Sequence, residues 1–338
     1  MKHRKEHLPL VNFCLLKPIL TSLEKSQIDW RKMLSELGLR RDLCLNSSGL
    51  YVPVIPAVDL LLEQSAHVTN DPSFGAKTAY YDNVEDWPIF AQAFRGSLSV
   101  SDFFVSLSRS LFRMCPSSSL KVNVTEDHAE CQIERRYQAR FKTKQKDAYV
   151  VIKFLRALQM MTESSFSDSQ VKISISDPNA IPEDYFKGQR AYSPDNLINI
   201  SFPSSWMLCS IKGDPIGSTG SAEHSVPIGI LGSLRHVLEN CADMNKLDSD
   251  SIASFCDCSL QSLQLELRKL GNSLSEEIMR ARMNRAMECL SEGMSVTRAA
   301  ELAGYRNSTS FSRAFKGWFG VAPKDSINHH AKLQRNTK

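Results

Sequence analysis

SVTRAAELAGYRNSTSFSRAFKGWFGVAP, residues 295–323, predicts two short helices joined by a tight turn. Small or apolar residues recur at helical spacing up to Ala303, and Gly304 follows where a left-handed cap would end a helix. Asn307 and Ser308 are suited to cap the first turn of a second helix. This second helix carries an apolar stripe that must be buried, formed by Phe311, Phe315, Trp318 and Phe319.

The opposite face of the second helix carries short hydroxyls and long cations but no carboxylate. Such a face fits a DNA groove, because arginine binds guanine bidentately and serine or threonine donates to bases or phosphates. The alternative is an ordinary amphipathic helix with a solvated basic face. The DNA-binding residues predicted in this helix are Ser308, Thr309, Ser310, Ser312, Arg313 and Lys316.

ELAGYRNSTSFSRAFKGWFGVAP closely resembles the second helix-turn-helix signature of the AraC/XylS family of bacterial transcription regulators. The shared pattern is a Gly-aromatic turn, a Phe-Ser-Arg-x-Phe-Lys core and a closing Phe-Gly-Val-x-Pro. The resemblance extends over residues 230–327 and implies an all-helical DNA-binding domain with two helix-turn-helix units.

The first of these units is expected between Asp250 and Gly271. Its second helix has a predicted buried stripe of Leu260, Leu263, Leu267 and Leu270. By the family resemblance, its exposed face would present Gln261, Gln264, Leu265 and Arg268 to DNA. A long helix, residues 275–290, would then join the two units, with Arg282 and Ala286 in the family's usual places. Leu265 stands where the family commonly has an arginine.

The charge of the chain is concentrated near its C-terminus. The net charge of 338 residues is only +4, but the segment from Met279 onward has 11 Lys and Arg against 4 Asp and Glu. Residues 230–278 have 4 against 8. Such a distribution favours a phosphate-binding surface around the second unit. The absence of long apolar runs and of a signal peptide, together with nine scattered cysteines, predicts a cytoplasmic protein without a membrane partner.

The first 200 residues predict an α+β domain. Helices are expected at residues 28–39, 57–67 and 101–114, with a turn at Asp71–Gly75. Apolar residues then recur at every second position, which predicts a hairpin from Leu120 to Ile133. A helix at 147–161 is expected next, followed by strands at 171–176 and 196–202. We expect an antiparallel sheet covered on one side. The order of segments resembles the N-terminal regulatory domain of ornithine-utilisation-type members of the AraC family.

The predicted organisation is therefore multidomain. We expect a regulatory domain at 1–212, a Gly/Ser/Pro-rich linker at 213–229, an AraC-type DNA-binding domain at 230–330 and a tail at 331–338. The glycines of the linker could instead form a phosphate-cradling loop, but no GK[ST] follows them.

No catalytic residues, cofactor or metal site are predicted, since HExxH and GxSxG motifs are missing. Cys256-Asp257-Cys258 could hold a soft metal or sense oxidants, but no further Cys or His cluster lies nearby to complete a site. Met160 and Met161 could line a ligand pocket with Phe154, although such a stripe also fits a helical core.

The sequence as a whole predicts a non-enzymatic, sequence-specific transcription regulator, with an activating role preferred. The expected partners are promoter DNA and RNA polymerase, with a small-molecule effector or dimerisation acting through the N-terminal domain. The alternative is a protein-interaction regulator whose helix-turn-helix array has lost DNA reading.

Overall fold

The chain is described here from a computed structural model covering residues 8–43, 49–137, 141–193, 197–211, 229–240, 244, 248–256 and 258–326. Contacts divide it into two compact units, an N-terminal one between residues 8 and 211 and a C-terminal one between 229 and 326. The short segment Gly38–Arg40 groups with the C-terminal unit. The predicted linker, the basic N-terminal tip and the tail lie outside the described residues, apart from Gly229 at the linker's end.

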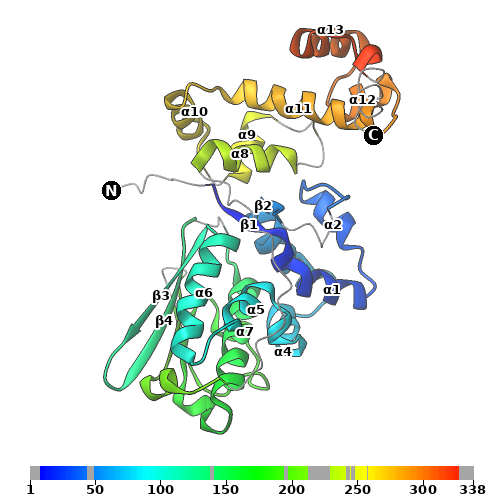
Figure 1. Ribbon diagram of the computed structural model, residues 1–338. Helices are drawn as coiled ribbons and strands as arrows, with labels where there is room; N and C mark the ends of the chain where they lie inside the picture. The colour runs from blue at the N-terminus through cyan, green and yellow to red at the C-terminus, as the bar shows by residue number, and fades with distance from the viewer. Residues whose placement is uncertain are drawn as a thin grey trace. The chain divides into compact units, whose positions relative to one another are not determined.

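The N-terminal unit begins with helices around a two-stranded ribbon (Figure 1). The ribbon pairs β1 with β2 antiparallel. The elements of this part are β1 Leu10–Asn12, η1 Phe13–Leu16, α1 Lys17–Lys25, α2 Trp30–Glu36, β2 Tyr51–Pro53, η2 Ile55–Leu60, α3 Leu61–Val68, α4 Phe74–Tyr81, η3 Val84–Asp86, α5 Pro88–Phe94 and α6 Val100–Met114.

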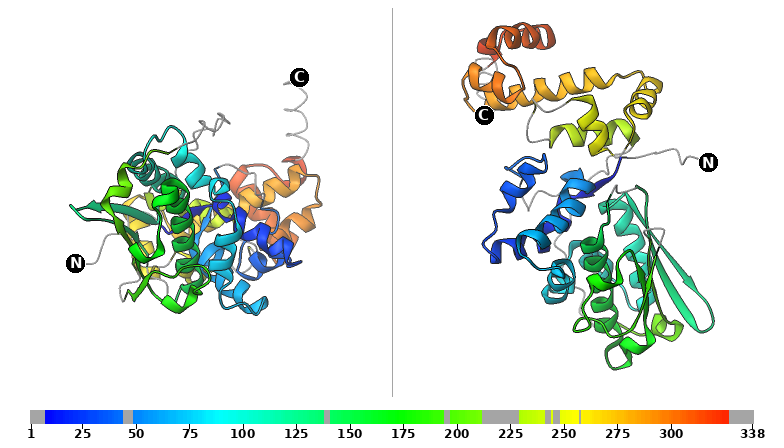
Figure 2. Two further views of the ribbon diagram at one scale, coloured as in Figure 1. Left: turned by 90° about the horizontal axis from the view of Figure 1, so that it is seen from below. Right: turned by 180° about the vertical axis from the view of Figure 1, so that it is seen from behind.

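A five-stranded sheet with a long helix completes this unit (Figure 2). The strand order is β3-β4-β7-β5-β6. The elements are β3 Ser118–Val124, β4 His128–Arg135, α7 Lys144–Thr162, η4 Glu163–Ser165, η5 Asp168–Gln170, β5 Lys172–Ile175, η6 Pro178–Ala180, β6 Gln189–Tyr192, β7 Ile198–Pro203 and η7 Ser204–Leu208.

The sheet buries one face, as the alternating sequence predicts. In β4, β7 and β5 every second side chain is buried. Helix α7 packs against β5 and β7, and α6 packs against β3 and reaches β7 through the rings of Phe104 and Phe202. The buried residues of these strands are Ala129, Cys131, Ile133, Ile173, Ile175, Ile198, Ile200 and Phe202. Strand β3 lies at the edge, so Val124 stays 55% exposed despite its place in the predicted alternation.

Two sequence expectations for the sheet are corrected. Strand β6 was not predicted, because Gln189–Tyr192 has no apolar alternation. It pairs parallel with β5, which makes the sheet mixed rather than antiparallel.

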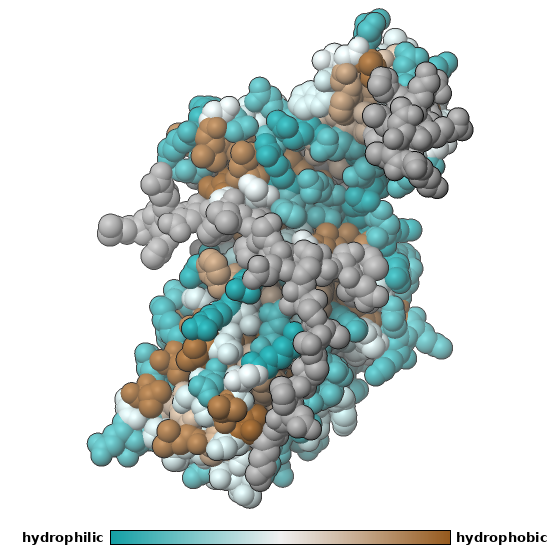
Figure 3. All heavy atoms as spheres, viewed as in Figure 1, coloured by the Kyte–Doolittle hydropathy of each residue, from teal (hydrophilic) through white to brown (hydrophobic). Residues whose placement is uncertain are grey.

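Apolar side chains of the unit's surface gather on the side where β3, β4 and α6 lie (Figure 3).

The predicted helices are present with shifted ends. Helix α2 begins after Asp29, whose carboxylate accepts a hydrogen bond from the backbone of Lys32 at 3.1 Å. The cap of α6 is a reciprocal pair of Ser99 and Asp102, so the helix begins before the predicted Ser101. The predicted helix at 57–67 has a π-helical first part, η2, and continues as α3 to Val68.

The predicted turn at Asp71–Gly75 is shorter than expected, because α4 already begins at Phe74. Gly75 lies inside this helix and donates its amide to Oε1 of Gln145 in α7 at 2.9 Å. A Cβ at Gly75 would lie 2.1 Å from the backbone oxygen of Gln145, so only glycine permits this approach of α4 to α7. Gly75 therefore serves helix packing rather than a turn.

The C-terminal unit consists of helices in its described part (Figure 1). They are α8 Gly229–Glu239, α9 Ser249–Phe255, α10 Leu260–Lys269, α11 Leu274–Ser291, α12 Val296–Leu302 and α13 Ser308–Phe319. Helix α8 ends at Glu239, within the range 230–330 expected for the DNA-binding domain. The protein thus combines an α+β N-terminal unit with a helical C-terminal unit, the multidomain fold class that the sequence predicts. No described helix is long and apolar enough to cross a membrane.

Candidate nucleic-acid interface

Helices α12 and α13 form the second helix-turn-helix unit, and local capping fixes both. Ser295 caps α12 by accepting a hydrogen bond from the backbone of Arg298 at 3.2 Å. Gly304, with φ of 83°, follows α12 in the left-handed conformation that favours glycine. Asn307 caps α13 through a 2.7 Å hydrogen bond from the backbone of Ser310. The positions of Gly304 and Asn307 match the sequence prediction, whereas the cap at Ser295 was not predicted.

The apolar stripe of α13 is only partly buried. Phe311 and Phe315 are fully buried against α11 and α12, with their ring centroids 5.5 Å apart. Phe319 is half-buried, with its ring 4.6 Å from Phe315. Trp318 was expected in the core but is 38% exposed, and Arg280 of α11 lies 5.8 Å from its ring centroid. Trp318 does not belong to the buried core of this domain, which consists of Met283, Ala286, Cys289, Leu290, Ala299, Ala300, Ala303, Phe311 and Phe315.

The predicted DNA-contacting face of α13 lies on the surface. Exposed residues of this face are Ser308, Thr309, Ser310, Arg313 and Lys316. Ser312 is half-buried and donates its hydroxyl hydrogen to the backbone oxygen of Ser308 at 2.7 Å. Its proton is therefore already used, which leaves Ser312 as an acceptor of hydrogen bonds rather than a donor to phosphates.

The cations of this face differ from most others in the C-terminal unit. Among the described residues, Arg306, Arg313 and Lys316 form no ion pair. Several cations on other helices of the unit are paired with carboxylates, in the pairs Arg235–Glu277, Lys269–Glu266, Arg280–Glu277, Arg285–Glu288 and Arg298–Glu301. Positive charge that is not compensated locally thus remains around α13, as phosphate binding requires.

Helices α9 and α10 form the first helix-turn-helix unit. Asp248 caps α9 by accepting a hydrogen bond from the backbone amide of Ser251 at 2.7 Å. Ser259 caps α10 in the same way, with the amide of Ser262 as donor at 3.1 Å. The predicted DNA-contacting residues Gln261 and Arg268 are exposed, and Gln264 is half-buried. Their spacing of three and four residues places them along one face of α10.

The leucine stripe of α10 is shorter than predicted. Leu263 and Leu267 are buried, but Leu260 is half-buried and Leu270 is 54% exposed. Leu270 follows the last helical residue, and Gly271, with φ of 72°, then turns the chain away from the core. Leu265 is 52% exposed beside Gln261 and Arg268, so an apolar side chain lies within the polar face of α10.

Helix α11 connects the two helix-turn-helix units. It begins with a reciprocal cap between Ser273 and Glu276 and runs for 18 residues, about 27 Å at 1.5 Å per residue. Arg282 donates to the backbone oxygen of Met244 at 3.0 Å, and Ala286 is buried in the core of the second unit. Both residues therefore have structural roles in this domain. Sequence reasoning did not find Glu277 of α11, which is buried and binds Arg235 of α8.

The cysteine pair of the first unit offers no visible metal site. Cys256 is buried and Cys258 is half-buried, and Asp257 lies outside the described residues. In the described part of the chain, no group of three or more His, Cys, Asp or Glu side chains is placed to hold a metal ion.

Residues 252–328 match a protein family described as a helix-turn-helix domain. The C-terminal unit is an AraC-type helix-turn-helix domain. A domain of this type makes the chain a DNA-binding transcription regulator, with double-stranded DNA as the partner of the domain. The match covers less than a quarter of the chain and leaves the N-terminal unit unassigned.

Several solved structures resemble the chain. The transcriptional regulator CdpR from Pseudomonas aeruginosa has 15% identity, with 93% of this chain and 98% of that one covered, at a TM-score of 0.42. A DNA-binding transcriptional dual regulator from Escherichia coli K-12 has 27% identity over 26% of this chain and 79% of that one, at 0.25. The C-terminal domain of AraT from Geobacillus stearothermophilus has 26% identity over 29% and 80%, at 0.26. All three TM-scores are low, and the match of residues 252–328 to the domain family is what identifies the C-terminal unit. No curated protein matches the chain.

Proposed function

We propose that this AraC-type domain reads a specific DNA sequence with α10 and α13, using Gln261, Gln264, Arg268, Ser308, Thr309, Ser310, Ser312, Arg313 and Lys316. The observation that carries the proposal is the surface of α13, which combines exposed hydroxyls with cations that have no carboxylate partner among the described residues. Arginine in a major groove discriminates guanine by about 1–3 kcal/mol. Arg313, which follows the capped first turn, is the side chain best suited to this contact.

Two recognition helices on one rigid connector favour a long binding site. The length of α11, about 27 Å, approaches the roughly 34 Å between successive major grooves on one DNA face. A monomer would therefore read two adjacent grooves through different helices. Its half-sites would differ in sequence, because α10 and α13 present different side chains.

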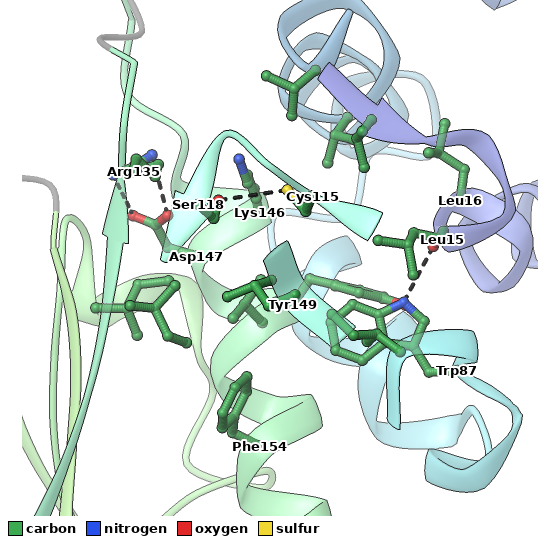
Figure 4. A pocket seen from close by; sticks show the side chains of 18 of the residues that line it. Leu15, Leu16, Trp87, Cys115, Ser118, Arg135, Lys146, Asp147, Tyr149 and Phe154 are labelled. Carbon is green, nitrogen blue, oxygen red and sulfur yellow. Dashed lines mark hydrogen bonds and ion pairs between the residues drawn. The ribbon is translucent and has the colours of Figure 1, made fainter. Parts of the chain in front are cut away.

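We further propose that the chain is an activator that contacts RNA polymerase and that residues 1–212 form its regulatory domain. The linker would span residues 213–229, the DNA-binding domain 230–330 and the tail 331–338. Support for homodimerisation comes from β3, an edge strand whose Val124 is exposed, and from Phe112 of α6, which is 52% exposed. Support for effector binding comes from a mostly apolar cavity in the N-terminal unit, whose lining includes Leu16, Trp87 and Phe154 (Figure 4).

The binding of DNA at two salt concentrations tests the proposal. The full chain would be used to select a site from random duplexes, and the anisotropy of that site and of a shuffled duplex would be measured at about 50 and 200 mM salt. We expect tighter binding to the selected site and a steep loss of affinity for both as salt rises. Failure to bind any duplex would favour the alternative, a protein-interaction regulator whose helices no longer read DNA.

A matched pair of variants locates the interface. Arg313→Ala removes a cation that has no ion-pair partner in the described part of the chain, whereas Arg298→Ala removes one that is paired with Glu301 at 2.9 Å on α12. Both changes lower the net charge equally. Only Arg313→Ala should abolish the preference for the selected site. If both variants weaken DNA binding equally, positive charge in general, and not Arg313 in particular, accounts for the binding.

A further inference from the structure

The outer side of α6 in the N-terminal unit carries a line of exposed residues. Asp102, Val105, Arg109 and Phe112 follow one another at intervals of three, four and three, which places them along one side of the helix. All four are exposed, and Val105 and Phe112 are 54% and 52% accessible to solvent. The inner side of α6 is buried in the unit. The helix thus fills the core with one side and keeps two large apolar groups on the other.

Further apolar side chains are exposed at the N-terminal end of α6. The chain around Leu208 runs beside this end, where Ile211 donates its amide to the backbone oxygen of Leu98 at 3.0 Å. Leu98 is 76% exposed and Leu208 is 82% exposed. Figure 3 shows apolar atoms gathered on this side of the unit. Single exposed apolar residues are ordinary, but a group of them on one side of a domain marks an interaction surface.

The two charged residues of this line are available for an intermolecular contact. Neither Asp102 nor Arg109 forms an ion pair with any residue that the structure describes. Oδ2 of Asp102 caps α6 by accepting hydrogen bonds from the amides of Leu98 and Ser99, at 3.2 and 3.1 Å. Its other oxygen accepts no hydrogen bond in the described part of the chain. Seven residues, about 10 Å along the helix, separate the two charges.

A second copy of the chain offers the matching charges. When two identical helices pack antiparallel about a two-fold axis, residues at equal distances from the axis on its two sides face each other. The midpoint between Asp102 and Arg109 lies within about 1 Å of Val105 along the helix. An axis at this point places Asp102 of each copy opposite Arg109 of the other, and Val105 opposite Val105.

The same register brings apolar groups together at both ends of the contact. Phe112 of one helix reaches the end of the other helix at which Leu98 and Leu208 are exposed. A parallel pair would instead place Arg109 beside Arg109 and Asp102 beside Asp102, where like charges repel each other. The charges of α6 therefore select the antiparallel arrangement.

We propose that α6 packs antiparallel against α6 of a second copy of this chain, with Val105 on the two-fold axis and two reciprocal ion pairs between Asp102 and Arg109. The inference rests on the proposed dimerisation through the N-terminal unit and specifies its surface and geometry. Strand β3 is the less suitable surface, because antiparallel pairing of two copies about its central residue would bring Lys121 opposite Lys121.

Cysteine cross-linking of the full chain tests this geometry. Val105→Cys places two thiols across the axis, so mild oxidation should convert it into a covalent dimer on a non-reducing gel. Leu98→Cys and Phe112→Cys should cross-link more efficiently when mixed than either does alone. Val68→Cys is the matched control, since Val68 is a 58% exposed valine of α3, and it should not exceed the parent with its native cysteines. Equal cross-linking of Val68→Cys and Val105→Cys, or self-linking of Phe112→Cys above that of the mixture, would overturn the proposal.

Charge variants separate the specific contact from general hydrophobic association. Sedimentation equilibrium of the full chain gives the dimer dissociation constant. Arg109→Asp places like charges at both symmetric contacts and should weaken the dimer about 10-fold. Adding Asp102→Asn, which keeps an oxygen for the helix cap, should recover part of this loss. Val105→Glu should abolish the dimer and Val68→Glu should leave it unchanged. A monomeric parent, or unchanged dimerisation of Arg109→Asp or Val105→Glu, would contradict the contact.

DNA selection by the same variants distinguishes this inference from the proposed function. Because one copy is proposed to read both grooves by itself, monomeric Val105→Glu should still select its DNA site. Specific DNA binding by a parent chain that stays monomeric would remove only the α6 contact. Dimerisation of a chain that selects no DNA site would support the contact and contradict the proposed DNA reading.

Discussion

The carboxylate of Glu277 in α11 accepts two hydrogen bonds from the guanidinium of Arg235 in α8, at 2.8 and 3.0 Å. Glu277 is buried while Arg235 is partly exposed, and Arg280 adds a weaker contact at 3.5 Å. This bidentate pair fixes the helix that connects the two recognition helices to α8. Two parallel hydrogen bonds between a guanidinium and a carboxylate are stronger than hydrogen bonds between neutral groups.

We expect the Arg235–Glu277 pair to make the stability of the C-terminal unit sensitive to acid. The hydrogen bonds from Arg235 hold the pKa of Glu277 below its ordinary value, although burial opposes this effect. Since the folded-state pKa is depressed, the stabilisation is present above the unfolded-state value and is lost as pH falls through the folded-state value. Glu277→Gln should lower stability at neutral pH by about 1–3 kcal/mol. Unfolding by denaturant between pH 7 and 3 measures both effects.

The informative quantity is the difference between the parent and Glu277→Gln at each pH. This difference should shrink as the solution is acidified, because the parent then loses the same interaction. Carboxyl groups of the N-terminal unit whose pKa is raised by burial, such as Glu63, affect both proteins alike and cancel. A difference that stays constant down to pH 3 would contradict the assigned role of Glu277.

Arg313→Ala should lose specific DNA binding while the fold stays intact. Arg313 is exposed on the face opposite Phe311 and Phe315, so its truncation removes a contact of about 1–3 kcal/mol without opening the core. The measurement is anisotropy on the selected site together with the circular dichroism of the variant. Parent-like affinity for the selected site would show that another face of α13 contacts DNA.

Phe315→Ala and Trp318→Ala should differ sharply in their effect on folding. Phe315 is fully buried, and removing a buried aromatic ring costs roughly 3–5 kcal/mol. Trp318 is 38% exposed and contacts Arg280, so its removal should cost much less. Amide hydrogen exchange of α12 and α13 in the full chain reports both changes locally. Equal loss of protection in the two variants would contradict the burial difference.

Leu265 should influence DNA binding through its apolar side chain. Because no cation occupies this position, Leu265→Arg should tighten non-specific DNA binding. The slope of the logarithm of the binding constant against the logarithm of the salt concentration should become steeper by about 0.9, the value for one added phosphate contact. Gln264→Ala should weaken specific binding only modestly, since Gln264 is half-buried, whereas Arg313 and Lys316 on α13 are exposed and form no ion pair among the described residues. Salt titrations of the variants on one duplex give these slopes. An effect of Gln264→Ala as large as that of Arg313→Ala would show that both units contribute equally.

The base read by Leu265 is also testable. Exposed apolar side chains contact the thymine methyl group in major grooves. Replacing thymine by uracil at single positions of the selected site removes this methyl group alone. At one position this replacement should weaken DNA binding by the parent protein but not by Leu265→Ala. If the replacement has no effect at any position, Leu265 does not contact a thymine methyl group.

Local sequence determined the second helix-turn-helix unit in detail. The caps at Asn307 and Gly304, and the shared face of α13 on which Phe311 and Phe315 lie, depend on neighbours within one or two helical turns. Periodicity and capping chemistry act over that same distance, so they predict these features directly. The exposed face that carries Arg313 was predictable for the same reason.

Tertiary structure alone decided which members of each apolar stripe are buried. Trp318 and Leu270 continue their stripes in sequence, but both lie near helix ends, beyond the partners that would cover them. Strand β6 is likewise specified by its parallel pairing with β5 rather than by its own residues. Burial at such places depends on what packs opposite, which a local pattern does not contain.

The same limit applies to the charged groups that shape the proposed sites. Asp59 and Lys146 are 87 positions apart in the chain, and Arg235 and Glu277 are 42 apart. Nothing in the sequence around either partner indicates the other, because a buried ion pair is selected by the folded geometry. The sequence thus determined the helices that are expected to read DNA, whereas only the tertiary structure formed the cavity of the N-terminal unit and paired Arg135 with Asp147 in its wall.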